Sequence, residues 1–344
     1  MSETAPLPAP RRILMLGATG TIGQATARAL LARGHEVVCF LRPCGTRRQA
    51  RLPDGAVLRY GDVTDPQSLA RDGFCGERFD ALVSCLASRT GVPRDAWAID
   101  HAAHSHALAA ARAAGATQVV LLSAICVQRP LLAFQQAKLA FEEELMRSGL
   151  AWSIVRPTAF FKSLSGQVKR VQEGRPFLVF GDGTLTACKP ISDDDLGRYM
   201  ALCLEDPALR NRILPIGGPG PALTPRAQAE MLFRLMGRPP KIRQVPVALL
   251  DAIIAGLSLG GRIIPALRDK AELARIGRYY ATESMLVLDP ATGRYDAEAT
   301  PSFGTETLED FYRQLLAGEA TVDLGEHAVF RERAVTAEGS PGNR

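Results

Sequence analysis

Short apolar runs recur through the first half of the chain and alternate with stretches whose apolar residues have helical spacing. The runs occupy residues 13–16, 37–41, 57–60, 81–84, 119–123 and 152–156. The helical stretches lie between them, at residues 24–33, 67–71, 97–114 and 133–147. Alternation of this kind is typical of parallel strands joined by crossover helices. We therefore predict an α/β fold with a doubly wound parallel sheet.

The pattern loosens after residue 157, where apolar, basic and glycine residues mix. One more strand-like run, residues 213–216, is followed by a Gly/Pro turn and is expected to return to the sheet. In such folds the substrate is bound outside the carboxyl ends of the strands, by later insertions. The predicted organisation is a flexible tail at 1–10, a nucleotide-binding core at 11–158 completed by about 190–216, a C-terminal substrate lobe at 159–189 and 217–330, and a second flexible tail at 331–344.

The most apolar segment covers residues 247–259 and contains a single charge, Asp251. It is shorter than the ~20 apolar residues that a membrane span requires. We expect a buried core helix here. The alternative is a helix that rests on a membrane or lines a pocket for a flat apolar ligand.

A glycine turn, Gly-Ala-Thr-Gly-Thr-Ile-Gly at residues 17–23, connects the first strand to the first helix. Glycine permits a sharp turn and a close approach of the backbone to a pyrophosphate, and the N–H groups at the helix start point at the phosphate charge. A strand before the turn and a helix after it predict a Rossmann dinucleotide site. The expected cofactor contacts in the turn are Gly17, Thr19, Gly20, Thr21, Ile22 and Gly23.

The second strand ends at Arg42, where NAD-binding proteins usually carry a carboxylate for the ribose 2′-hydroxyl. A guanidinium suits a 2′-phosphate, so NADPH is the predicted cofactor, although Arg42 and the arginines that follow could be a solvated basic loop. Asp62 follows the third strand and is expected to accept from the adenine amino group, or else to form a Gly-Asp turn. Ser84 and Ala87, after the fourth strand, are expected to flank the cofactor.

The amino-acid composition limits the classes of binding partner that we expect. The chain has 344 residues, 47% of them hydrophobic, and a net charge of +5 from 41 basic and 36 acidic residues that are interspersed. No basic block interleaved with aromatic residues is present, so we expect no nucleic-acid partner. Seven cysteines without a C-x-x-C pair, and no apolar signal sequence, predict a reduced cytoplasmic protein. The cluster His101, His104 and His106 lacks an acidic or cysteine partner at ligand spacing, so no metal site is expected.

Ser123 closes the fifth strand and Lys138 lies in the following helix. This arrangement resembles the short-chain dehydrogenase/reductase superfamily, in which a serine and a Tyr-x-x-x-Lys pattern serve catalysis. Phe134 stands where the tyrosine would be, which places the chain with the atypical, extended branch. The resemblance implies that Lys138 orients the nicotinamide ribose or helps to relay a proton, and that Ser123 positions the reactants. Tyr280, next to Tyr279, is the candidate for the missing hydroxyl donor.

Five further stretches narrow the resemblance: residues 121–128, 154–164, 188–192, 214–220 and 277–286. They are similar to the NADPH-dependent divinyl chlorophyllide a 8-vinyl-reductase family, over roughly residues 11–325. The resemblance implies reduction of the C8 vinyl group of a magnesium tetrapyrrole, divinyl chlorophyllide or protochlorophyllide, in chlorophyll or bacteriochlorophyll biosynthesis. The pigment brings its own magnesium, so the protein needs no metal.

The residues at the end of the sixth strand and after it are expected to contact the cofactor and the pigment. Pro157, at the end of that strand, is expected to border the cofactor. Phe160 and Phe161 offer aromatic faces to the pigment ring and Lys162 offers an ammonium to its propionate, with Arg156 and Lys189 as second choices. The alternative is a core pair of phenylalanines beside a solvated lysine.

Two other functions stay open at this point. A non-catalytic NADP-sensing regulator of the same fold would also keep the glycine turn and lack the tyrosine. An atypical reductase of another conjugated double bond would resemble the chain mainly over its first half.

Overall fold

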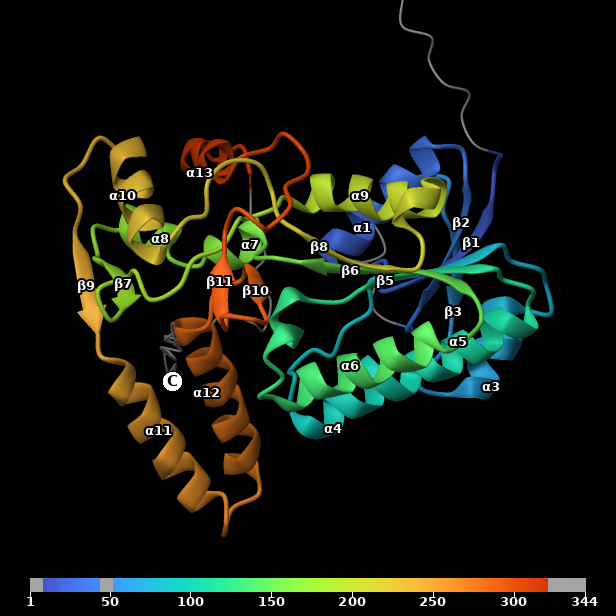
Figure 1. Cartoon of the computed structure of the whole chain (residues 1–344), viewed down its shortest axis with the longest axis horizontal. Helices are drawn as coiled ribbons and strands as arrows, with labels where there is room; N and C mark the ends of the chain where they lie inside the picture. Colours follow the sequence, from blue (N-terminus) through green and yellow to red (C-terminus); the bar gives the residue numbers. More distant parts are fainter. Residues whose placement is uncertain (1–8, 44–51, 321–344) are drawn as a thin grey trace, which may run out of the picture.

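A seven-stranded parallel sheet forms the centre of the molecule in the computed structural model, which describes residues 9–43 and 52–320 (Figure 1). The strand order is β3-β2-β1-β4-β5-β6-β8, and all neighbouring pairs are parallel. The strands are β1 (Arg12–Leu16), β2 (Glu36–Leu41), β3 (Val57–Tyr60), β4 (Ala81–Ser84), β5 (Gln118–Leu122), β6 (Ala151–Pro157) and β8 (Arg212–Ile216). The order reverses beside β1, so the predicted doubly wound fold is confirmed.

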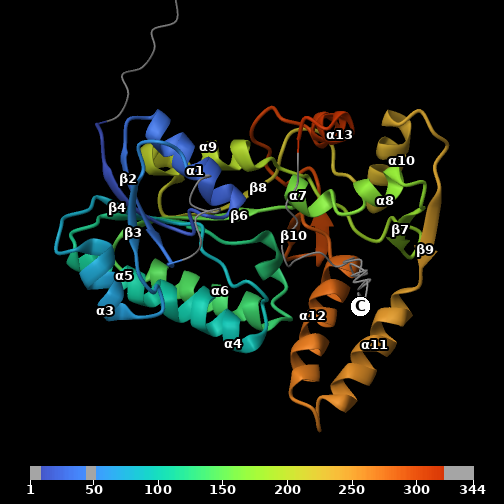
Figure 2. The ribbon, with the colours of Figure 1, turned by 180° about the vertical axis from the view of Figure 1, so that it is seen from behind.

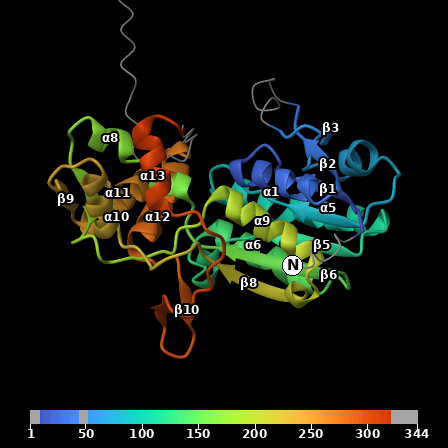
Figure 3. The ribbon, with the colours of Figure 1, turned by 90° about the horizontal axis from the view of Figure 1, so that it is seen from above.

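Helices cover both faces of the sheet (Figures 1 and 3). One face carries α1 (Thr21–Ala32) and α9 (Asp193–Glu205), which pack against each other. The opposite face carries α3 (Pro66–Ser68), the π-helical η1 (Leu69–Phe74), α4 (Pro93–Ala96), the π-helical η2 (Trp97–Ala103), α5 (His104–Ala113) and α6 (Ala133–Met146). Short 3₁₀ turns lie at η3 (Ile125–Gln128) and η4 (Pro207–Leu209). Two apolar cores, one on each side of the sheet, hold these layers together.

The predicted helices are present, with different boundaries and with π-helical segments in two of them, η1 and η2. The first begins at Thr21, three residues earlier than its apolar periodicity indicates, because the glycine turn leads directly into it. The stretch 97–114 is one continuous rod in which the π-helical η2 precedes α5. The run at 213–216 forms β8 beside β6, as predicted.

The later insertions build a separate lobe at one side of the sheet (Figure 2). Its elements are α7 (Phe161–Leu164), α8 (Val168–Gln172), β7 (Phe177–Phe180), α10 (Pro225–Leu235), β9 (Ile242–Val245), β10 (Val287–Asp289), β11 (Arg294–Asp296) and α13 (Leu308–Ala317). The lobe has its own core, in which the fully buried Tyr312 packs among residues of α7, α8, α10 and α13. A further apolar cluster around Phe134 and Cys188 joins the lobe to the sheet domain.

The apolar segment near residue 250 forms α11 (Val247–Gly260), which pairs with α12 (Ala266–Thr282) in a hairpin. The hairpin extends away from the sheet and the lobe in both opposite views (Figures 1 and 2). No residue of α11 is buried, so the prediction of a buried core helix is wrong. Within residues 9–43 and 52–320, no helix combines the length and the apolar character needed to cross a membrane.

Candidate active site

The turn between β1 and α1 is fixed by two glycines that tolerate no side chain. Gly17 has φ +76°, and a Cβ there would lie 2.4 Å from the backbone carbon of Cys85 at the end of β4. A Cβ on Gly23 would lie 2.1 Å from the Gly17 carbonyl oxygen. Gly20 is the N-cap of α1, and no side chain caps this helix terminus. The first turn therefore presents backbone N–H groups, which is the cradle a diphosphate needs.

The other residues of the turn hold its shape. Ile22 packs against the core, and the Thr19 carbonyl accepts a hydrogen bond from the side chain of Gln24 at 3.0 Å. Asp193, at the start of α9, is partly buried close to Thr21, and its Oδ1 has no hydrogen-bond partner among the described residues. Burial is the main cause that raises the pKa of Asp193, and the neighbouring Thr21 opposes this shift. The turn thus lies beside the next helix on the same face of the sheet.

Arg42 and Asp62 lie near each other at the ends of β2 and β3. Arg42 is exposed. The Asp62 carboxylate accepts hydrogen bonds from the Thr64 hydroxyl at 2.7 Å and from the Thr64 N–H at 2.9 Å. These bonds are the main cause that lowers the pKa of Asp62, and the positive charge of Arg42 is a smaller cause. A fixed carboxylate and an exposed guanidinium therefore lie where an adenosine moiety is expected. Arg47, Arg48 and Arg51 lie outside the described residues.

Ser84 is the last residue of β4 and Ala87 lies three residues beyond it, but the two differ in solvent exposure. Ala87 is exposed, whereas Ser84 is buried with its hydroxyl 2.8 Å from Nε2 of His104. The other ring nitrogen, Nδ1, is 2.8 Å from the Ile99 carbonyl. Burial lowers the pKa of His104 to about 4. The neutral ring therefore donates from Nδ1 and accepts from Ser84, which commits that hydroxyl to the protein interior.

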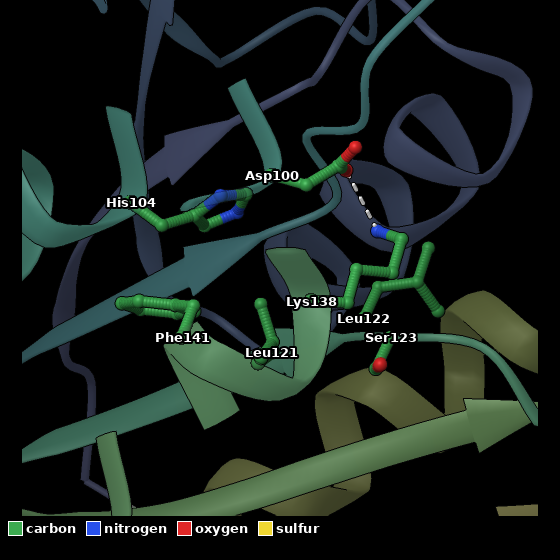
Figure 4. Close-up of a pocket in the computed structure, with 7 residues that line it drawn as sticks. All are labelled: Asp100, His104, Leu121, Leu122, Ser123, Lys138 and Phe141. Atoms are coloured by element: carbon green, nitrogen blue, oxygen red, sulfur yellow. Dashed lines mark ion pairs between the residues drawn. The ribbon is translucent and has the colours of Figure 1, made fainter. Parts of the chain in front are cut away.

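Lys138 and Ser123 line one small pocket at the carboxyl end of β5 (Figure 4). The Lys138 ammonium lies 2.9 Å from Oδ1 of Asp100, whose side chain is fully buried in η2. The same oxygen accepts from the Ser88 N–H at 3.2 Å, and Oδ2 has no hydrogen-bond partner among the residues that the structure describes. The Ser123 hydroxyl points away from this pair (Figure 4). The pocket is lined by Asp100, His104, Leu121, Leu122, Ser123, Lys138 and Phe141.

Ser123 belongs to a second buried network. Its hydroxyl donates to Glu142, which is one turn along α6 from Lys138 and only 1% exposed. Glu142 also forms an ion pair with Arg156 of β6, whose side chain is 14% exposed. Both carboxylate oxygens of Glu142 therefore have a partner within the protein. The structure commits Arg156, a second-choice substrate residue, to this internal ion pair.

Aromatic residues close the other side of this region. Phe134 is almost buried, and a Cβ added at Gly91 would lie 3.5 Å from its ring. The Tyr279 hydroxyl donates to the Cys126 carbonyl at 2.8 Å. The Tyr280 hydroxyl is 3.9 Å from the Cys126 sulfur, and burial of this hydroxyl raises its pKa, while the residue as a whole is 46% exposed. Tyr280 thus has a sheltered hydroxyl and an accessible ring.

The residues beyond β6 divide between core and surface. Pro157 is buried at the strand end, and Phe161 is 4% exposed and stacks on Phe311 in the lobe core, as the core-pair alternative expects. Phe160 and Lys162 are partly exposed, and Lys162 is close enough to Asp193 to lower its pKa. Lys189 donates to the Thr300 carbonyl at 2.9 Å. Lys189 is likewise partly exposed, so Phe160, Lys162 and Lys189 all keep some access to a ligand.

Sequence reasoning missed Asp100 and Glu142, and a signal for both was present. Residues 96, 103, 107 and 111 are buried alanines on one side of the η2–α5 rod, and position 100 falls on that side. Glu142 likewise lies between the buried Phe141 and Leu145 of α6. An acidic residue on the apolar side of a predicted helix requires a partner, which points to a polar site.

Comparisons with known proteins give a consistent result. A family model described as NAD(P)H-binding matches residues 17–207. The chain is 50% identical to the chloroplastic divinyl chlorophyllide a 8-vinyl-reductase of Oryza sativa subsp. indica, over 94% of this chain and 83% of that protein, and 46% identical to that of Arabidopsis thaliana, over 91% and 79%. The NADPH complex of the NADPH-dependent quinone oxidoreductase QOR2 from Escherichia coli is a structural neighbour, with TM-score 0.64, 18% identity and coverage of 88% and 99%. This structural likeness concerns the fold alone.

Proposed function

The chain belongs to the divinyl chlorophyllide a 8-vinyl-reductase family, and we propose on this basis that it reduces the C8 vinyl group of divinyl chlorophyllide, or of divinyl protochlorophyllide, to an ethyl group. The observation that carries the proposal is the identity of 46–50% to the curated plant enzymes along more than 90% of the chain. The reaction belongs to chlorophyll biosynthesis, and we extend the proposal to the bacteriochlorophyll route. The sensing regulator and the reductase of a different double bond lack comparable support.

The cofactor is NADPH, and the turn at 17–23 fits it. Glycine occupies positions 17 and 23, where a Cβ would collide with backbone atoms. The uncapped start of α1 presents N–H groups for the diphosphate. We assign Arg42 to the 2′-phosphate and Asp62 to the adenine. The cofactor supplies a hydride when bound, and a proton supplies the second hydrogen that the ethyl group needs.

The Lys138–Asp100 pair holds the nicotinamide ribose in this proposal. Lys138 is anchored at 2.9 Å by a buried carboxylate, so its remaining N–H donors have a fixed direction. Asp100 acts through Lys138 and is a positioning residue. The Ser123 hydroxyl donates a hydrogen bond to Glu142. This bond supports the proposal that Ser123 shapes the pocket and does not take part in the reaction.

Tyr280 is the proposed proton donor. Phe134 removes the usual phenol, while the Tyr280 hydroxyl lies close to the Cys126 sulfur on the segment that follows β5. The hydroxyl is protonated at neutral pH, as a general acid must be, and burial raises its pKa and so makes the free phenol a weaker acid. Tyr279 is committed to the Cys126 carbonyl and serves as the control: Tyr280→Phe should reduce turnover more than Tyr279→Phe. Equal turnover of Tyr280→Phe and the unmodified protein would remove Tyr280 from the mechanism.

Phe160 and Lys162 are the proposed pigment contacts. An aromatic face can stack on the macrocycle, and the ammonium can pair with its propionate carboxylate. Phe161, Arg156 and Lys189 support this region through the lobe core, the Glu142 ion pair and the Thr300 carbonyl. Because the pigment is largely apolar, we also propose that the protein contacts a membrane surface peripherally.

The test is an anaerobic assay of the purified protein with divinyl chlorophyllide and NADPH or NADH, followed by absorbance. Reduction of the conjugated vinyl group shifts the Soret band of the pigment to the blue. Arg42→Ala should reduce the preference for NADPH over NADH about tenfold to a hundredfold, the value of a charge-assisted bond pair. Arg147→Ala is the matched control, since Arg147 is exposed at the far end of α6. An unmoved pigment spectrum with NADPH overturns the proposed function.

A further inference from the structure

The hairpin formed by α11 and α12 carries an exposed stripe of apolar and glycine residues. Leu249, Ile253, Gly256 and Gly260 of α11 follow one another at spacings of four, three and four, which places them on one helical face. Leu249 and Ile253 at these positions are 51% and 43% exposed. The stripe continues through the end of α11 into the turn before α12, where Leu259, Ile263 and Ile264 are 64%, 85% and 53% exposed. We call Leu259, Ile263 and Ile264 the tip.

Basic side chains surround the tip. Arg262 directly precedes Ile263 in the sequence, and Arg268 and Lys270 follow at the start of α12, all three exposed. Arg268 is held in place because its Nε donates to the Gly261 carbonyl at 2.7 Å. Asp269 is the one acidic residue between 252 and 271. The end of the hairpin thus combines large apolar side chains with a net positive charge.

We propose that the hairpin docks on an anionic lipid bilayer, with the tip inserted among the acyl chains and Arg262, Arg268 and Lys270 at the phosphate headgroups. An apolar surface bordered by Lys and Arg is the composition that binds such an interface. The 14 residues of α11 extend roughly 21 Å, less than the ~30 Å hydrocarbon core, so the hairpin enters one leaflet only. The hairpin also extends away from the sheet and the lobe, so nothing in the described chain blocks its approach (Figures 1 and 2).

Charge favours a lipid surface over a second copy of this chain. In a twofold contact between two tips, the net positive end of one hairpin would meet the net positive end of the other, and like charges at a desolvated interface are unfavourable. Anionic headgroups instead neutralise them. This inference deepens the proposed peripheral contact, and it does not depend on the pigment reaction.

Flotation of the purified full-length protein with vesicles tests the proposal, without pigment or NADPH. The probes are vesicles of phosphatidylglycerol and phosphatidylcholine, compared with vesicles of phosphatidylcholine alone. We expect binding to the anionic vesicles that falls as salt rises, because screening weakens headgroup attraction. Ile263→Glu should reduce this binding about tenfold or more, since an exposed isoleucine then no longer enters the acyl region. Met146→Glu is the matched control, because Met146 is exposed at the end of α6 on the sheet domain.

Each result is decisive for the docking proposal. Loss of binding with Ile263→Glu and not with Met146→Glu supports it, and so does weak binding to the neutral vesicles. Equal binding of all three proteins, or no binding to anionic vesicles, overturns it. A dimer in sedimentation that Ile263→Glu dissociates, with no vesicle binding, assigns the tip to a second copy and also overturns it. If pigment reduction proceeds while vesicle binding fails, only the docking surface is wrong.

Discussion

The sheet domain and the hairpin depart in opposite directions from the usual distribution of polar and apolar side chains. Beside β5, the sheet domain buries Asp100, Glu142 and His104, each 1% exposed. The hairpin instead exposes Ile253 and Ile263, and its first helix has no buried residue. Charge in the interior and apolar surface in water are both unfavourable when nothing compensates them.

The two regions differ in where the compensation comes from. Each of these three buried groups has a partner within the chain, Lys138 for Asp100, Arg156 for Glu142 and Ser84 for His104, although Oδ2 of Asp100 has none among the described residues. The described chain supplies no such cover for the hairpin. Buried charges that are paired within the chain indicate a site held ready for its ligand, whereas an uncovered apolar face indicates a contact that another body must complete. Substitutions that remove the compensation in each region test this contrast.

The largest effect is expected for Glu142→Ala. This change leaves Arg156 without its anion and Ser123 without its acceptor, in a region where both are largely buried. Breaking a buried ion pair from one side costs about 3–5 kcal/mol in the free energy of unfolding. Urea denaturation followed by circular dichroism measures it. Glu143→Ala is the matched control, because Glu143 is 57% exposed and its pair with Arg147 is worth less than about 1 kcal/mol. Equal losses for the two variants would contradict the assigned role of Glu142.

The stability of the protein should depend on pH through His104, and we expect this effect to be slightly smaller than that of Glu142→Ala. The pKa of His104 is about 4 in the folded protein and 6.5 in its ordinary state. As pH falls below 6.5 the unfolded chain takes up the proton first, so the contribution of His104 to stability is present above pH 6.5 and is lost toward pH 4. The full loss is on the order of 3 kcal/mol.

The difference between the unmodified protein and His104→Gln isolates this contribution, because buried His35 and the carboxylates titrate in both. Urea denaturation at pH 7, 6 and 5 should show a smaller decrease for the variant. Parallel curves for the two proteins would mean that His104 is charged or solvated in the folded state.

The contrast also explains which features the sequence could predict. The parallel sheet and the glycine turn were predictable because strand alternation and the need for Gly17 and Gly23 are local properties of the backbone. The Asp100–Lys138 pair was not predicted because its members are 38 positions apart and meet only when η2 packs on α6. The individual site assignments, such as Arg42 to the 2′-phosphate, stay predictions.

The fate of the apolar segment at 247–259 was predicted wrongly for a related reason. Hydrophobicity shows that a helix needs cover and does not show whether the same chain provides it. The expected core helix would have required the lobe to close around α11, and the lobe instead builds its core from α7, α8, α10 and α13. Phe161 illustrates the reverse case, since a predicted ligand contact contributes to that core.

Asp100→Asn should destabilise the fold less than Glu142→Ala. The amide keeps the volume of the carboxylate and can still accept from the Ser88 N–H, but it leaves Lys138 without its counter-ion. The expected cost is about 2 kcal/mol. A positioning role predicts in addition a lower kcat with a smaller change in KM for NADPH.

The double variant Asp100→Asn, Lys138→Met is the control for this pair. It removes both charges, so it should recover part of the stability and none of the turnover. Additive losses in the free energy of unfolding would show that the two side chains do not interact.

The smallest effect on stability is expected at the tip of the hairpin. Ile263→Ala and Ile13→Ala make the same chemical change at sites that are 85% and 0% exposed. In the β1 core the truncation should cost about 2–5 kcal/mol, because it leaves a cavity, whereas at the tip the change should stay within about 0.5 kcal/mol. Urea denaturation at two protein concentrations measures both. A large and concentration-dependent loss for Ile263→Ala would mean that this side chain is already buried against another copy in solution. The exposed face would then be an oligomer interface, and the contrast with the self-sufficient network of the sheet domain would disappear.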